Sequence, residues 1–457
     1  MGHTTSAPRF TNPGMRPALR ACVIASIWLV GATNLRAQYL EDPSPPGIHL
    51  MISAKAVRVL SAEPVDQTGP VSMQIDRYQI EGTGHLTAEA YAEPLPSADG
   101  VQLRLTLVGH SSGIGRSSVR SIQLHTQSCS QVCVQQNILV TPHGISASQA
   151  AVHAPSRSHL LYVETSKPLV RGLMTRGMAR LAFRMQPQRS AQIATQVAET
   201  SLSEQMQRES RERLAQANKD FRDRFLESLK DFDFSADDLR LQSTQSAVFA
   251  QLNSPNVPAV SPAPHFAAAD LAVRVHQDVL NRFFEQALGG TKHTGKPLEA
   301  DLADLYKSLN LKPMPEVDPR PWSITLAKRD PVTVRFDRDQ AEVVIRGAAY
   351  TIELDEYPAM NVIVRYVLMP VDTGWKAVRS IPTVQPPEGQ PGFSKQLSRK
   401  QITLVMFLAR KFSDLFPREI DFRRLPLPEG APRQLQGHYT RVHAERGWLL
   451  NEWNLDR

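Results

Sequence analysis

The segment Gly109-His110-Ser111-Ser112-Gly113 matches the G-x-S-x-G pattern of a serine hydrolase. In that pattern the serine is the nucleophile and lies on a sharp turn from a strand into a helix. A strand-like segment precedes Ser111, but Ile114-Gly115-Arg116-Ser117 leads into another strand-like segment and not into a helix. A Gly/Ser-rich strand or turn is therefore the favoured interpretation, and a serine hydrolase that uses Ser111 is the alternative.

Two further segments resemble a phosphate loop and a calcium loop, and each lacks a required residue. Residues 290–296 carry the glycines and lysine of a phosphate loop, but Pro297 stands where the loop needs a hydroxyl, so we expect a mobile loop. In residues 231–237 every second side chain carries oxygen, as in a calcium loop. However, Ala236 stands where such a loop has a glycine, and Gln242 stands where it has a glutamate. The sequence therefore predicts no catalytic residue, no cofactor and no metal site.

The cysteines are Cys22, Cys129 and Cys133. In an exported protein a close pair of cysteines is more often oxidised than free. The three residues between Cys129 and Cys133 suit a disulfide across a tight loop, provided that the Cα atoms lie within about 7 Å. We predict this local disulfide, because the spacing does not match a redox C-x-x-C motif.

His438 and His443 are the histidines of the last expected hairpin, Gln434–His443 and Trp448–Leu455. Their numbers differ by an odd amount, so a regular strand would direct them to opposite faces. We therefore expect ordinary surface or packed histidines and no metal ligands.

The first 37 residues are typical of a signal peptide. They contain four arginines and no acidic residue, and Ala21–Ala32 form a short apolar stretch. A spanning helix needs about 20 apolar residues, so cleavage after Ala37 or Ala32 is favoured over an uncleaved anchor. We expect an exported protein, periplasmic or secreted, with no transmembrane span after cleavage.

Composition and charge exclude several classes of protein. With 41% hydrophobic and 21% charged residues and a mean hydropathy of -0.30, the chain is globular. Removal of residues 1–37 takes away four arginines, so the net charge falls from +7 to 7 − 4 = +3. No long basic run remains, and we therefore expect no nucleic-acid partner.

The expected organisation begins with a β-rich module at 38–187. Leu103, Leu105 and Leu107 alternate as in a half-buried strand, and Gly69-Pro70, Gly82 and Gly84 are interpreted as turns. Residues 188–232 lack Gly and Pro and carry apolar residues three or four apart, which predicts a long amphipathic helix. We favour packing of this helix within the chain over a role in binding a partner protein.

A strand at 239–252 completes the middle segment, 188–253, and a proline-rich linker at 254–266 precedes a C-terminal α+β module at 267–457. This module should hold short helices at 277–288 and 298–309, an antiparallel meander, and a helix from Ser398 to Phe416. The last helix is apolar nearly all round, so we expect a curved sheet to wrap it.

The order of elements in residues 270–455 resembles that of tubular lipid-binding (TULIP-like) proteins. The resemblance implies a bent sheet around a long helix, with an apolar tunnel between them. The fold class that we predict is thus α+β, with two antiparallel β-rich modules, a long amphipathic helix between them and a buried C-terminal helix.

The function predicted from the sequence is that of an exported, non-enzymatic envelope protein. We expect an apolar or lipid ligand to lie against the last helix, at Leu404, Leu408 and Phe412. An envelope protein that contacts a partner protein through the 188–232 helix is a further alternative.

Overall fold

The computed structural model describes residues 47–75, 78–119, 122–165, 169–185, 187–230, 234–254, 263–266, 269–308, 320–372, 374–388, 396–422 and 436–456. The predicted signal peptide, residues 255–262 of the predicted linker, and Asp231 and Asp233 of the calcium-like segment lie outside the described residues. In the part of the chain that is described, no helix is long and apolar enough to cross a membrane.

The chain divides into two compact units. Among the described residues, the first unit comprises those within 47–52, 227–239 and 250–456, and the second comprises those within 53–226 and 240–249. Both are rich in antiparallel strands, and a long helix follows the strands of the second unit, so the predicted α+β class is confirmed.

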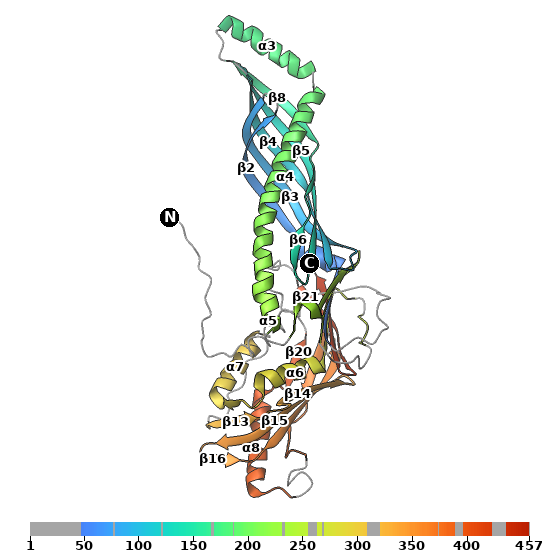
Figure 1. The fold of residues 1–457 in the computed structure, drawn as a ribbon, viewed down its shortest axis with the longest axis vertical. Helices are drawn as coiled ribbons and strands as arrows, with labels where there is room; N and C mark the ends of the chain where they lie inside the picture. Colours follow the sequence, from blue (N-terminus) through green and yellow to red (C-terminus); the bar gives the residue numbers. More distant parts are fainter. Residues whose placement is uncertain are drawn as a thin grey trace. The chain divides into compact units, whose positions relative to one another are not determined.

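The second unit is built on long antiparallel strands in the order β2-β3-β4-β5-β6, with β7 and β8 also paired to β5 (Figure 1). Its elements are α2 (Ala54–Ser61), β2 (Glu63–Ile75), β3 (Tyr78–Leu95), β4 (Val101–Val119), β5 (Ile122–Thr141), β6 (Gly144–Ala147), β7 (Ala151–His153), β8 (Ser156–Thr165), α3 (Leu169–Met185), α4 (Pro187–Asp220) and η1 (Phe221–Leu226), together with most of β9 (Leu239–Ser243) and the start of β10 (Ala247–Asn253).

The strands of this sheet are longer than the sequence predicted. Gly69, Pro70, Gly82 and Gly84 were expected in turns, but they lie inside β2 and β3. Pro70 is tolerated because β2 is an edge strand, where a missing N–H leaves no ladder bond unmade. The 20 residues of β5 therefore run for about 66 Å at the usual rise of a strand.

Helix α4 lies along this sheet (Figure 1). Its 34 residues correspond to about 51 Å of helix, so it spans most of the length of the strands. Ala198, Leu202 and Met206 pack against a core that includes Leu107 and Val132. The predicted long helix is thus confirmed, and it packs within its own unit.

The first unit contains two sheets. In one, the strands of this unit follow the order β21-β22-β11-β1-β10, and the other has nine strands around β15 and β17. The elements not yet given are β1 (Gly47–Ser53), α5 (Glu227–Lys230), η2 (Ala236–Asp238), β11 (Leu271–His276), α6 (Gln277–Leu288), β12 (Lys292–Thr294), α7 (Gly295–Ser308), β13 (Trp322–Leu326), β14 (Val332–Asp337), β15 (Gln340–Ile352), β16 (Asp355–Tyr357), β17 (Met360–Val371), β18 (Gly374–Arg379), β19 (Thr383–Gln385), α8 (Arg399–Leu415), β20 (Glu419–Phe422), β21 (Gln436–Glu445) and β22 (Trp448–Asp456).

Helix α8 begins and ends where the sequence predicted. Ser398 is its N-cap and forms a capping box with Gln401, and the helix packs into the core of the nine-stranded sheet. The phosphate-like segment, in contrast, is not a loop. Residues 292–294 form β12 and Gly295 begins α7, so the expectation of a mobile loop was wrong.

Candidate functional site

A cavity of about 1120 Å³ lies between α4 and the sheet of the second unit. Protein interiors are packed nearly as densely as organic crystals, and voids larger than a water molecule are few. A space of this size, partly open to solvent, is a groove and not an ordinary packing defect. Pockets that bind small ligands are usually smaller, about 300–1,000 Å³.

One row of small residues across the sheet accounts for the cavity. The register aligns one residue from each of five strands in what we call the glycine–serine row, and all five line the cavity: Gly69, Gly84, Gly113, Ser128 and Ser158. None of these side chains extends beyond a hydroxymethyl group. The sheet therefore cannot fill the space beneath α4 at this level, although its backbone ladder is continuous.

The rows on either side of the glycine–serine row are also modest in size. One contains Gln67, Leu86, Ser111 and Ser130, and the other contains Val71, Gly82, Gly115 and Thr126. The period of two in a strand places all three rows on the same face, toward the helix.

Helix α4 supplies aliphatic side chains opposite the sheet, together with polar ones such as Arg189 and Ser201. Ile193, Val197 and Leu202 line the cavity from the helix, and Ile122 and Leu124 of β5 line it from the sheet. Aliphatic side chains around a long gap, with hydroxyl groups interspersed, suit a ligand that is mainly apolar.

The two ends of the cavity differ. At one end the gap closes, because Val132 and Val134 of β5 pack with Leu202 and Met206 of α4. At the other end α3 lies beyond the ends of the long strands (Figure 1), and its residues Ala179 and Phe183 belong to the lining.

Side-chain hydrogen bonds attach α4 to the β6–β8 side of the sheet. The Ala154 N–H donates to Glu199 Oε1 at 3.1 Å, and the Ser156 N–H donates to Thr195 Oγ1 at 3.0 Å. Near the end of the helix, Asn218 accepts from the N–H and donates to the carbonyl of Ile145, both at 2.7 Å. These bonds hold the helix over the sheet.

Charged groups lie where α4 passes the edge strand β2. On this side Gln205 Nε2 donates to Gln67 Oε1 at 3.0 Å. Glu204, Arg208 and Glu209 also belong to the lining. The cavity thus combines an apolar interior with a polar margin along β2, an arrangement that fits an amphipathic molecule.

The serine of the hydrolase-like motif lines this cavity, but the motif is not a nucleophile elbow. Ser111 lies in the middle of β4, between Leu86 of β3 and Ser130 of β5 in an unbroken register. An elbow needs a turn from a strand into a helix. The structure confirms the favoured interpretation, because this Gly/Ser-rich segment is part of a strand.

The predicted disulfide is not formed. Cys129 and Cys133 both lie in β5 and carry free thiols. Four residues of extended strand separate their Cα atoms by about 13 Å, well beyond the reach of about 7 Å that a disulfide allows. The prediction assumed a tight loop at this point, and the continuous strand corrects it.

The residues predicted to contact a ligand in the C-terminal module lie in a packed core. Leu404 and Leu408 are fully buried and Phe412 is 3% exposed, among residues of the nine-stranded sheet. Trp322 packs edge-on to Phe412 at 6.2 Å between ring centroids. This packing accounts for the apolar helix without a ligand, and the role of these residues in ligand binding stays a prediction.

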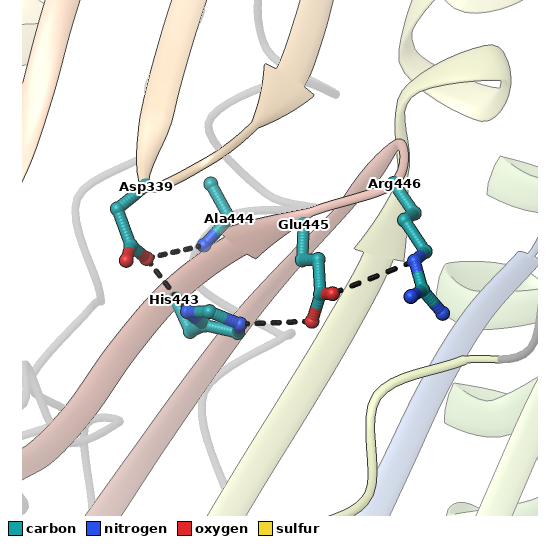
Figure 2. A network of polar contacts seen from close by, with 5 residues as sticks. All are labelled: Asp339, His443, Ala444, Glu445 and Arg446. Carbon is teal, nitrogen blue, oxygen red and sulfur yellow. Dashed lines mark hydrogen bonds and ion pairs between the residues drawn. The ribbon is translucent and has the colours of Figure 1, made fainter.

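A polar network in the first unit fixes the turn between β14 and β15 against β21 (Figure 2). Asp339 accepts from the Ala444 N–H at 3.2 Å and contacts His443 Nδ1 at 2.6 Å. His443 Nε2 lies 3.2 Å from Glu445, which is 3.5 Å from Arg446 Nε. The network joins the β14–β15 turn to the β21–β22 hairpin. Its contacts hold these two hairpins together, which is a structural role.

The expected orientation of the two histidines in β21 was wrong. A bulge between Tyr439 and Arg441 adds one residue to the strand, so His438 pairs with Asn454 and His443 with Leu450. Their partners are four residues apart, which places both histidines on the same face.

A second buried polar cluster lies in the other sheet of this unit. Arg274 Nε donates to His49 Nδ1 at 2.9 Å, and its guanidinium lies over the ring of Phe266 at 4.6 Å. The His49 ring is 5.1 Å from that of Trp448. Burial first, and then the charge of Arg274, lower the pKa of His49 from 6.5 to about 3.

No protein-family model matches the sequence, and no curated protein matches it. Among solved structures, one of a lipopolysaccharide binding protein aligns with 90% of this chain and 99% of its own chain, at 13% identity and a TM-score of 0.34. A TM-score this low does not establish a shared fold.

Proposed function

We propose that the protein is an exported, non-enzymatic envelope protein that binds an apolar or lipid ligand in the cavity of the second unit. The observation that carries this proposal is the glycine–serine row, which keeps about 1120 Å³ free beneath an apolar face of α4. A water-filled gap against Ile193 and Val197 would leave apolar surface solvated, whereas an acyl chain would bury it.

The ligand class follows from the shape and polarity of the lining. The cavity extends between a long strand and a long helix, so it suits a chain and not a compact molecule. Glu204, Arg208 and Glu209 at the β2 margin can contact a polar headgroup while the chain lies against the interior. The export part of the proposal is supported by the leader, residues 1–37, and N-terminal sequencing of mature protein should find a start after Ala37 or Ala32.

The test is a substitution that fills part of the cavity from the side of the sheet. Ser128→Phe adds an aromatic ring to the inner face of β5, in the glycine–serine row. Gln127→Phe adds the same ring to the neighbouring exposed position, which points away from the cavity. Delipidated wild-type protein should bind an environment-sensitive fluorescent fatty acid, and native mass spectrometry of protein from its own envelope should detect an acyl species.

Ser128→Phe should weaken binding of the probe at least about tenfold, because the ring occupies space that the chain needs. Gln127→Phe should bind as the wild type does. Wild-type protein that takes up neither the probe nor any acyl species would refute the proposal, as would equal binding by both variants.

A further inference from the structure

Helix α3 presents an apolar face to solvent. Met178, Leu181 and Met185 are 71%, 59% and 73% exposed. Their spacing of three and four residues places them on one side of the helix. Clustered apolar side chains in solvent usually mark a surface that another molecule covers.

The opposite side of the same helix is already occupied. Ala179 and Phe183, which are four residues apart, line the cavity. At 3.6 residues per turn they lie across the helix from the exposed side chains. The exposed face is therefore not needed to hold α3 onto its own unit.

The charge of α3 indicates what kind of surface covers its exposed apolar face. Residues 169–185 contain four arginines and no acidic residue. Of these, Arg176 and Arg180 have exposed side chains. A basic helix with an apolar face is typical of helices that lie in the interface of a bilayer, where arginine is attracted to anionic headgroups.

We propose that α3 docks the protein onto the surface of an anionic phospholipid bilayer. Met178, Leu181 and Met185 enter the boundary between headgroups and acyl chains, and the positive charge of α3, which includes Arg176 and Arg180, attracts the helix to the anionic surface. Because Ala179 and Phe183 belong to the same helix, docking brings the α3 end of the cavity to the membrane. This inference goes beyond the proposed ligand site, since docking requires only the outer face of α3.

The experiment measures co-flotation of the full mature chain with vesicles. Wild-type protein should float with vesicles of phosphatidylcholine and phosphatidylglycerol, and much less with phosphatidylcholine alone. The triple variant Met178→Ser/Leu181→Ser/Met185→Ser should reduce the partition coefficient at least about tenfold. Met406→Ser is the matched control, because Met406 is also 71% exposed but lies on α8 in the first unit.

The electrostatic part of docking is tested separately. Arg176→Gln/Arg180→Gln should weaken flotation several-fold at low salt, and high salt should remove the difference from wild type. Arg335→Gln/Arg338→Gln changes the net charge by the same amount at exposed positions in the first unit and should have no effect.

The proposal is overturned if wild-type protein does not float with anionic vesicles. It is also overturned if the triple variant floats as well as Met406→Ser does. Failure of docking is distinguishable from failure of the ligand site. The triple variant should still bind the dissolved fatty-acid probe, and Ser128→Phe should still float.

Discussion

Protonation of His49 should destabilise the first unit in mild acid. Arg274 Nε donates to His49 Nδ1, so this nitrogen must be unprotonated in the folded state. The imidazole is 1% exposed, and a second cation beside Arg274 would lie in a buried site with little solvent to screen it. The pKa of His49 is accordingly lowered to about 3.

The size of the effect follows from this pKa. Above pH 6.5 the imidazole is neutral in both the folded and the unfolded chain, so its contribution does not change with pH. Below pH 6.5 the unfolded chain binds a proton that the folded chain does not, and the free energy of unfolding decreases. At about 1.4 kcal/mol for each tenfold change in affinity, the loss is about 2 kcal/mol at pH 5 and about 4 kcal/mol at pH 3.

Tryptophan emission is a suitable readout, because Trp322, Trp375, Trp448 and Trp453 all belong to the first unit. Urea unfolding of the mature chain should be compared at pH 7 and pH 5 for wild type and His49→Asn. Asparagine keeps an acceptor near the position of Nδ1 but does not titrate. Burial also lowers the pKa of His276, so the difference between the two proteins isolates His49. Equal losses of stability in both proteins would refute the reasoning.

Three further predictions concern residues that the sequence singled out. Leu408→Ala should reduce the free energy of unfolding of the first unit by about 2–5 kcal/mol in urea titrations, because a fully buried side chain is removed from the core, and it should leave binding of the fatty-acid probe unchanged. Mature protein purified without reductant should yield free Cys129 and Cys133 in a thiol assay, with Cys129 the faster because it is exposed, and an oxidised pair in the intact mass would contradict the structure. A fluorophosphonate probe should not label the chain, and labelling that Ser111→Ala abolishes would support the hydrolase alternative instead.

The elements with strong local signals could be predicted from the sequence. Gln277–Leu288 is helical as expected, and the Ser398 and Gln401 capping box begins α8. Helical residues from Pro187 to Lys230 match the long helix, apart from a π-helical turn at Phe221–Leu226. Caps and apolar spacing are local properties, so they do not depend on knowing the fold.

The long strands of the second unit could not be predicted in the same way. Gly82 and Gly84 are turn residues by local propensity, yet they lie within an 18-residue strand because both neighbouring strands pair with it there. Cross-strand pairing is a tertiary effect, and it overrides propensity. The disulfide between Cys129 and Cys133 was predicted for the same reason, since a tight loop was expected where β5 is continuous.

The cavity beneath α4 was not predicted from the sequence, because size and polarity were considered strand by strand. A signal was present in the sequence, as small residues alternate at Gly82 and Gly84, at Gly113 and Gly115, and at Ser128 and Ser130. In one strand such alternation only weakens packing. Aligned across five strands by the register, it becomes a continuous groove beneath a helix.

The two units differ in how closely the sheet packs against its helix, α8 in the first unit and α4 in the second. Beneath α8, the sheet of the first unit contributes large side chains such as Tyr350 and Met360, and the core is closed around Leu404. Beneath α4, the sheet of the second unit contributes the glycine–serine row. The helix is held in place by hydrogen bonds that backbone N–H groups donate to Thr195, Glu199 and Asn218, and by the packing of Leu202 and Met206 at one end. A helix attached along one side and packed at one end does not need a filled core along its whole length. The second unit can therefore hold α4 over a groove, as the proposed binding of an apolar chain would require.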